Sequence, residues 1–157
     1  MLTVGIVDDE ELIRRHIKNS IDWDKLQMSV RWEAEDGKKA QSKVEQLSAD
    51  IIIIDINIPY IDGLELSEWI SHYYPGIKII ILTGYREFEY ARRAINSHVA
   101  DYILKPIDKA EFEKSLAKVR LQIEQEKKQA AYLSSLEDRI HKSETSEIKA
   151  ALHKILT

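Results

Sequence analysis

The chain has no cysteine among its 157 residues, which excludes disulfide bridges, thiolate zinc sites and a thiol nucleophile. No apolar run approaches the roughly 18 residues that a membrane-spanning helix needs. The first residues lack the basic region and long apolar stretch of a secretory signal peptide. The net charge is −4 and the pI is near 5.8, so the chain lacks the positive charge that is usual in a nucleic-acid-binding segment. These absences predict a cytoplasmic protein segment that contacts neither membrane nor DNA itself.

What the sequence does contain suits a folded domain with an appendage. Hydrophobic residues make up 44% of the chain, enough for a core, and charged residues make up 32%, which suits a solvated surface. The length exceeds the roughly 100–150 residues that are typical of one domain. One compact domain followed by a smaller extension is therefore the simplest division.

Strand and helix patterns alternate before residue 109. Strands are expected at Leu2–Val7, Met28–Ala34, Ile51–Asp55, Ile77–Thr83 and Tyr102–Leu104, and helices near Glu11–Ile17, Lys38–Leu47, Leu64–Tyr74 and Glu87–Ser97. A polar connection containing Ile21, Trp23 and Leu26 separates the first helix from the second strand. From Lys109 onward the pattern is helical. This alternation predicts a doubly wound α/β sheet with right-handed crossovers and helices on both faces.

Asp55 is the most informative residue. It follows four consecutive isoleucines, Ile51–Ile54, which indicate a strand buried on both faces of a parallel sheet. A carboxylate at the end of such a strand has left the core without reaching open solvent. That position suits a magnesium ligand or a nucleophile.

Polar residues follow the other strands as well. Asp8 and Asp9 come after the first strand, Thr83 ends the fourth, and Lys105 follows the fifth. Singly, each has an ordinary explanation: Asp8 and Asp9 also supply a helix N-cap, and Lys105 suits a solvated loop. Doubly wound sheets, however, bind ligands at the carboxyl ends of their strands, where these residues gather. Clustered carboxylates favour Mg²⁺, and an ammonium group and a hydroxyl suit phosphoryl oxygens, so the set predicts an aspartyl-phosphate.

The ordered motifs resemble the receiver domain of bacterial two-component response regulators. They are Asp8-Asp9, Asp55-x-x-x-Pro59-x-x-Asp62-Gly63, Thr83-Gly84, Tyr102 and Lys105-Pro106. The resemblance covers residues 1–121, which we take as the receiver domain. It implies a flavodoxin-like five-stranded sheet in the order 2-1-3-4-5, followed by a long C-terminal helical extension.

The resemblance also implies a role for each site residue. Asp55 accepts a phosphoryl group from a sensor histidine kinase, and Lys105 binds a phosphoryl oxygen. Asp9 and Asp55 ligate Mg²⁺ together with the backbone carbonyl of Asn57, and Asp8 acts through water.

Thr83 and Tyr102 form the implied switch pair. The hydroxyl of Thr83 moves toward the phosphoryl group, and the ring of Tyr102 turns inward behind it. The bond between Lys105 and Pro106 is expected to be cis, as is usual in the family.

One subgroup, the response regulators with an AraC-type DNA-binding domain, is the most similar. Ile21-Asp22-Trp23, residues 84–91 and the helical tail carry this likeness. The output domain is absent from these 157 residues, so DNA binding and transcriptional control belong to a longer parent protein. His98 stands where the family usually has glycine, and its consequence is open.

The tail carries a heptad-like seam with polar interruptions. Its apolar positions are Phe112, Leu116, Val119, Ile123, Ala130, Leu133 and Ile140. Phe112, Leu116 and Val119 are expected to pack on the sheet rather than in the seam. Residues 122–142 form either an intermolecular coiled coil or a solvated linker helix. Ser143–Ser146 are expected to break the helix, with residues 143–157 beginning a further, truncated helical segment.

Three functional hypotheses follow. The leading one is a phosphorylation-activated signalling switch that is not an enzyme, forming a homodimer through the C-terminal helix, the last strand–helix face, or both. A receiver-like interaction module that needs no phosphorylation is the second. A Mg²⁺-dependent phosphohydrolase with an aspartate nucleophile is the third, although Asn57 stands where such enzymes place a second aspartate.

Overall fold

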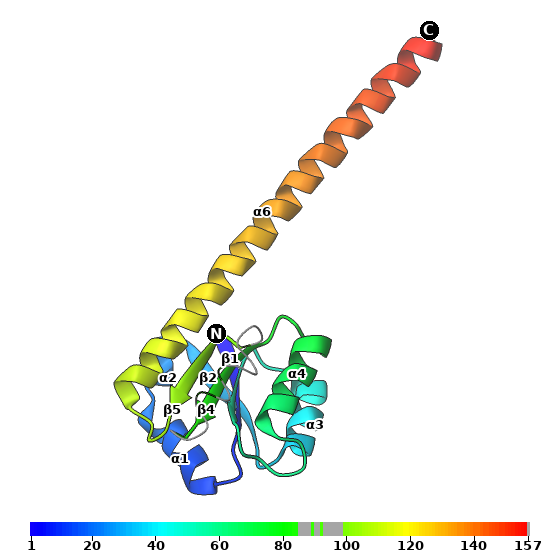
Figure 1. The fold of residues 1–157 in the computed structure, drawn as a ribbon. Coiled ribbons are helices and arrows are strands. Elements are labelled where there is room, and N and C mark those ends of the chain that lie inside the picture. The colour runs from blue at the N-terminus through cyan, green and yellow to red at the C-terminus, as the bar shows by residue number, and fades with distance from the viewer. Residues whose placement is uncertain (85–88, 90–91, 93–98, 157) are drawn as a thin grey trace. The chain divides into compact units, whose positions relative to one another are not determined.

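The computed structural model describes residues 1–84, 89, 92 and 99–156, with side chains beyond 143 described only at 151 and 153–155. Within these ranges, five parallel strands form one sheet in the order β2-β1-β3-β4-β5 (Figure 1). The strands are β1 (Leu2–Val7), β2 (Met28–Ala34), β3 (Ile51–Asp55), β4 (Lys78–Thr83) and β5 (Asp101–Leu104). The predicted doubly wound sheet and its strand order are confirmed.

The helices alternate with the strands. They are α1 (Glu11–Ser20), α2 (Trp23–Leu26), α3 (Gly37–Leu47), α4 (Gly63–Tyr73) and α6 (Lys109–Leu156). The helix expected at Glu87–Ser97 and the substitution at His98 lie outside the described residues, apart from positions 89 and 92. None of the described helices combines the length and apolar character needed to cross a bilayer. The cytoplasmic location stays a prediction.

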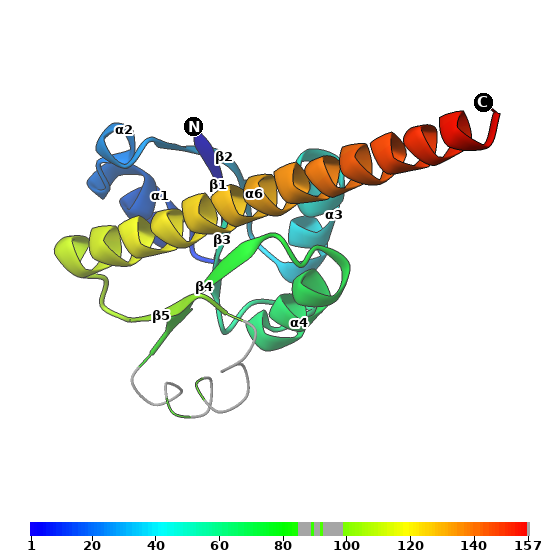
Figure 2. The same cartoon turned by 90° about the horizontal axis from the view of Figure 1, so that it is seen from above.

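Alternating side chains of β3 supply both faces of the core. Ile52 and Ile54 pack in one cluster with residues of α3 and α4. Because neighbouring strand residues point to opposite faces, Ile51 and Ile53 face the other side, where α1 and the first turns of α6 lie (Figure 2). All five residues of β3 are buried. The predicted burial of Phe112, Leu116 and Val119 on α6 is confirmed.

The connection after α1 contains a short helix that the sequence pattern missed. α2 is one turn long, too short to show hydrophobic periodicity. The Asp22 side chain caps it by accepting a hydrogen bond from Lys25 N at 3.2 Å. The indole Nε1 of Trp23 donates to Lys18 O at 3.0 Å, which fixes the turn to the end of α1.

Ser48 carries a strained backbone after α3. Its φ of 55° and ψ of −175° lie in a region that is essentially restricted to glycine. We expect Ser48→Gly to raise the free energy of unfolding by about 1 kcal/mol, because relief of strain exceeds the added entropy of the unfolded chain. Ser42→Gly, within α3, is the matched control and should lower stability by about 0.5 kcal/mol. Urea unfolding compares them, and equal losses would contradict the assignment of strain.

The C-terminal helix corrects one expectation. α6 continues without interruption from Lys109 to Leu156, so the predicted break at Ser143–Ser146 is wrong. Serine, threonine and glutamate have only modestly lower helix propensity than alanine, and this stretch has no glycine or proline to end a helix. The chain divides into two units, Met1–Val119 and Arg120–Thr157. The domain boundaries given above stay predictions.

Candidate functional site at the carboxyl edge of the sheet

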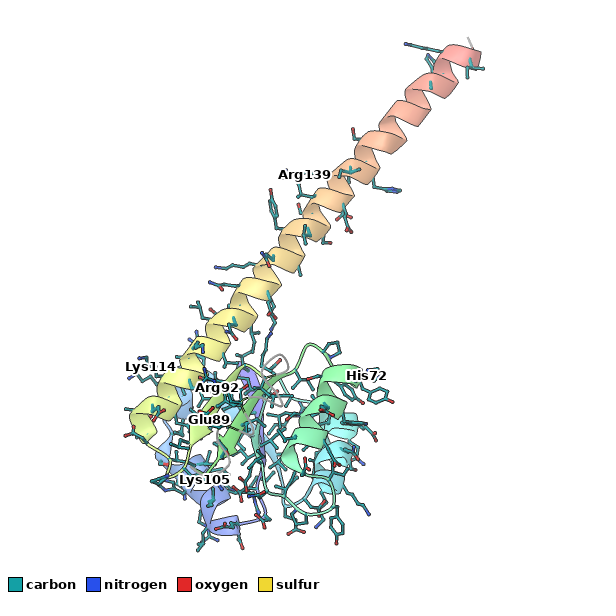
Figure 3. All side chains as sticks on the ribbon, viewed as in Figure 1. His72, Glu89, Arg92, Lys105, Lys114 and Arg139 are labelled. Carbon is teal, nitrogen blue, oxygen red and sulfur yellow. The ribbon has the colours of Figure 1, made fainter. Side chains whose placement is uncertain are left out.

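Three predicted residues meet at one edge of the sheet. Asp8 follows β1 and is fully buried, and Asp55 ends β3 with 5% of its surface exposed. The Nζ of Lys105, which follows β5, lies 3.2 Å from Asp55 Oδ1 and 3.4 Å from Asp8 Oδ2. Figure 3 labels Lys105 at this edge, well away from His72 on α4. The ammonium group therefore balances two buried carboxylates that come from different strands.

Local hydrogen bonds hold Asp8 in place. Its Oδ1 accepts from Glu10 N at 2.9 Å, and its carbonyl accepts from Arg14 Nη1 at 2.6 Å. Arg14 is itself fixed by Glu33, whose Oε1 lies 3.1 Å from Arg14 Nε. Glu10 occupies the N-cap position of α1, so the predicted N-cap at Asp8 and Asp9 is wrong. The carboxylate of Asp8 turns toward Lys105 instead of capping the helix.

The loop after Asp55 is packed too tightly for a larger residue at Gly63. A Cβ atom there would lie 2.5 Å from Asp55 O and 2.7 Å from Ile56 Cα. Gly63 N donates to Ile56 O at 2.9 Å, and Asp62 caps α4 by accepting from Glu65 N at 2.9 Å. Glycine therefore lets α4 begin directly against the end of β3, which fixes the backbone of the candidate nucleophile.

Burial controls the protonation of the site. It raises the pKa of Asp55 to about 6, and the charge of Asp8 adds to this effect while Lys105 opposes it. Burial also raises the pKa of Asp8. For Lys105, burial acts to lower the pKa, but the neighbouring carboxylates of Asp55 and Asp8 outweigh it and raise the pKa above its usual range. At neutral pH, above its pKa of about 6, the Asp55 carboxylate is thus largely ionised beside the Lys105 ammonium group.

An acidic cluster beside this pair has the chemistry of a cation site. Carboxylate oxygens of Asp8, Asp9 and Glu10 lie within 4.8 Å of one another. Asp9 and Glu10 are exposed, so an ion could reach the cluster and keep several waters, as Mg²⁺ does in proteins. The residues present therefore fit Mg²⁺. Sequence reasoning missed Glu10, although its place directly after two aspartates was a signal.

The predicted switch residues occupy neighbouring strands. Thr83 is fully buried, and its Oγ1 donates to Gly84 O at 3.3 Å. Lys105 N donates to Thr83 O at 2.8 Å, which joins the ends of β4 and β5. The hydroxyl of Tyr102 faces the surface, 3.5 Å from Arg92 O. The peptide bond between Lys105 and Pro106 is cis, as expected.

Comparison with known proteins decides the family. The response regulator receiver domain matches residues 4–117, most of the chain. The chain belongs to the receiver domain family of response regulators. Receiver domains are signalling domains, and they generally bind Mg²⁺ at an acidic pocket.

The similar curated proteins are transcriptional regulators. The transcriptional regulatory protein HptR of Staphylococcus aureus strain NCTC 8325 is 37% identical over 139 residues, which is 88% of this chain and 54% of HptR. The uncharacterized transcriptional regulatory protein YesN of Bacillus subtilis is 32% identical over 155 residues, 99% of this chain and 39% of YesN. The receiver domain described here thus spans about half or less of the length of these relatives.

Solved structures agree with the predicted subgroup. The receiver domain of AraT from Geobacillus stearothermophilus has a TM-score of 0.76 and 40% identity, covering 80% of this chain and 98% of that one. A two-component transcriptional regulator AraC from Clostridium phytofermentans has a TM-score of 0.75 and 31% identity, covering 80% and 97%. The receiver fold and the likeness to AraC-type regulators are therefore confirmed.

Proposed function

We propose that this receiver domain is a phosphorylation-activated switch whose phosphoacceptor is Asp55. The observation that carries the proposal is the buried contact of 3.2 Å between Asp55 Oδ1 and Lys105 Nζ, at a strand end that also gathers Asp8. The carboxylate is a nucleophile that stays ionised at pH 7.5, because that pH lies well above its pKa of about 6. The cation beside it is placed to receive a phosphoryl oxygen.

The transfer consists of one displacement at phosphorus. A carboxylate oxygen of Asp55 forms the new P–O bond while the P–N bond to the kinase histidine breaks, and the electron pair of that bond returns to the imidazole. Lys105 then pairs with a phosphoryl oxygen, and Thr83 donates its hydroxyl to another. Hydrolysis of the resulting aspartyl phosphate resets the domain.

Magnesium is the expected cofactor of this step. Asp9 and Asp55 would ligate it together with the backbone carbonyl of Asn57, and Asp8 would act through water. Bound there, Mg²⁺ reduces the repulsion between the carboxylates and an incoming phosphoryl group. The carboxylates of Asp9 and Glu10 are exposed, which gives the ion access to the site from this side.

Incubation with acetyl phosphate and Mg²⁺, followed by intact-mass measurement, tests the proposal. Wild type should gain one phosphoryl group, and Asp55→Asn or removal of Mg²⁺ should prevent the gain. Wild type that remains unmodified would instead support a phosphorylation-independent interaction module. Continuous turnover of phosphate esters would support the phosphohydrolase.

The kinase is expected to dock beside Lys105. Leu12, Ile13 and His16 of α1, together with Pro106 and Ile107, line a groove of about 570 Å³ that Lys105 also borders. Leu12 is 74% exposed, so most of its apolar surface faces solvent. An apolar surface next to the phosphoacceptor suits a kinase helix that packs in the groove and presents its phosphohistidine to Asp55.

Leu12→Asp should separate docking from chemistry. We expect its phosphorylation by a histidine kinase that modifies wild type to lose about tenfold in kcat/KM, because a charge enters the apolar contact. The rate with acetyl phosphate should not change, since this small donor needs no docking surface. Leu121→Asp, a substitution of another exposed leucine, is the control. Equal losses with both donors, or none with either, would contradict docking at this groove.

A second copy of the chain is the expected partner of the tail. Leu133 and Ile140 on the seam are each 58% exposed in the single chain, which leaves apolar surface for a coiled-coil contact. Phosphorylation is expected to promote this dimer. The relatives suggest that the output of the longer protein is transcriptional, through a DNA-binding domain beyond these residues.

Sedimentation of the phosphorylated and unmodified chain tests dimerisation. Phosphorylated wild type should show the larger dimer fraction. Leu133→Asp should weaken the dimer about tenfold or more by burying a charge in the seam, whereas Ser135→Asp, off the seam, should not. The same monomer fraction in phosphorylated wild type, unmodified wild type, Leu133→Asp and Ser135→Asp would rule out a phosphorylation-dependent dimer through the seam.

A further inference from the structure

The carboxylate of Asp101 joins the switch strand to the C-terminal helix. Asp101 is the first residue of β5 and directly precedes Tyr102. Its Oδ1 accepts a hydrogen bond from Tyr102 N at 2.9 Å. Its Oδ2 accepts from Ser115 Oγ on α6 at 2.6 Å, and Lys118 Nζ lies 3.7 Å from the same oxygen. One side chain thus holds the backbone of the predicted switch residue and two consecutive turns of α6.

The surroundings make this contact a defined connection. Ser115 is 4% exposed, so its hydroxyl has little access to water that could replace the carboxylate. A short hydrogen bond from a hydroxyl to a carboxylate is among the stronger types in proteins. Lys118 adds a charge on the exposed side, with 56% of its side chain in solvent. The serine therefore fixes the geometry, and the lysine contributes little to it.

The other side of α6 has a different attachment. Glu113 Oε1 accepts from Asp22 N at 3.3 Å, which links the same helix to the connection before α2. That connection leads from α1 through α2 to β2, the edge strand at the opposite end of the sheet from β5. Besides its buried apolar side chains, α6 thus has polar contacts both to the strand of the switch and to a part of the domain that the switch does not include.

Backbone pairing connects the phosphoacceptor edge of the sheet to the hydrogen bond between Asp101 and Ser115, which we call the clamp. β4 and β5 are paired from Ile80 and Asp101 to Thr83 and Leu104, and Lys105 N adds the bond to Thr83 O. A shift of Thr83 toward a phosphoryl group would therefore move β5 as well. Tyr102 and Asp101 move together because they are adjacent and hydrogen-bonded.

We propose that Asp101 and Ser115 are positioning residues that transmit the state of Tyr102 to α6. The inference rests on the proposed function, because it needs phosphorylation of Asp55 to move Tyr102. Movement of β5 shifts the carboxylate of Asp101, and the carboxylate carries Ser115 and the first turns of α6 with it. The turns of α6 that receive the change belong to the same unit as the sheet, Met1–Val119.

A spin label on α6 tests the transmission. The chain has no cysteine, so Lys114→Cys gives a single labelling position on an exposed residue next to Ser115 (Figure 3). The spectrum is recorded with Mg²⁺ before and after addition of beryllofluoride, a phosphoryl mimic. The otherwise wild-type chain should change its spectrum. Ser115→Ala, which keeps a good helix former at a buried position, should retain less than half of that change.

Two further variants complete the experiment. Asp101→Asn keeps the size of the side chain and should reduce the change as Ser115→Ala does, while Glu113→Ala should preserve it. Acetyl phosphate should modify Asp55 at similar rates in all variants, which separates transmission from chemistry. Full spectral changes in Ser115→Ala and Asp101→Asn would overturn the inference, as would a modified wild type whose label never responds. Failure of Asp55 to accept a phosphoryl group would instead reject the proposed function.

Discussion

Asp55→Asn is expected to stabilise the magnesium-free protein by about 2–3 kcal/mol at pH 7.5. In the folded chain the pKa of Asp55 is about 6, raised from 3.8 mainly by burial and then by the charge of Asp8. A raised pKa means that folding favours the protonated carboxyl group. The stability from this preference is fully present below pH 3.8 and is lost as the pH rises through 6. The amide in the Asp55→Asn variant is neutral at every pH, so the variant keeps this stability.

The pH dependence identifies the cause. The advantage of Asp55→Asn should be near zero at pH 4, grow between pH 4 and 6, and level off above pH 7. Mg²⁺ should stabilise wild type and reduce the difference, because an ion that binds only the folded state shifts the unfolding equilibrium. Urea unfolding with a chelator and with Mg²⁺ measures both effects. Glu68→Gln on the exposed side of α4 is the control and should change stability by less than about 0.5 kcal/mol. An Asp55→Asn variant that is less stable than wild type at pH 7.5 would oppose this explanation.

Lys105→Met is expected to have the opposite effect, a loss of about 3 kcal/mol at pH 7.5 without Mg²⁺. The substitution keeps the length of the side chain but removes the cation 3.2 Å from Asp55 and 3.4 Å from Asp8. Both carboxylates are buried, so they would face each other without compensation. Phosphoryl transfer from acetyl phosphate should also fall, since no cation remains to pair with the phosphoryl oxygens.

The pH dependence of this variant follows from the carboxylates. The pKa of Lys105 is raised above its usual 10.5, so the stability from its charge is present below that value and is lost only as the pH rises beyond it. Between pH 5 and 8 the lysine stays charged, whereas Asp55, with a pKa of about 6, takes up a proton as the pH falls. The loss caused by Lys105→Met should therefore shrink at pH 5, where protonation of Asp55 removes its repulsion with Asp8. Lys109→Met, on the exposed surface of α6, is the control. Wild-type stability of Lys105→Met at pH 7.5 would contradict the assigned charge balance.

The fold and the location of the site were predictable because both depend on simple patterns. Four β-branched isoleucines before Asp55 favour a buried strand, and the alternation with helices placed the carboxyl ends of all strands at one edge. That placement predicts that Lys105 lies near Asp8 and Asp55. It does not predict the distances between them, because Lys105 and Asp8 are 97 positions apart in the chain and meet through packing that no local pattern encodes.

Other features needed the structure for specific physical reasons. The one-turn helix α2 is shorter than any periodic signal, and the strain at Ser48 arises where α3 must turn sharply into the next connection. The helix through Ser143–Ser146 persists because weak helix formers inside a long helix do not end it. The clamp between Asp101 and Ser115 joins a strand to a helix, and neither residue is unusual in its own segment.

Chemical trapping of the aspartyl phosphate tests the central claim most directly. The chain is incubated with acetyl phosphate and Mg²⁺ and then treated with sodium borohydride, which reduces an acyl phosphate to an alcohol and so converts the modified aspartate to homoserine. Peptide mass spectrometry locates the change. We predict homoserine at position 55 and unchanged aspartate at Asp8 and Asp9. Homoserine at either of those positions, or at none, would contradict the assignment of Asp55 as the phosphoacceptor.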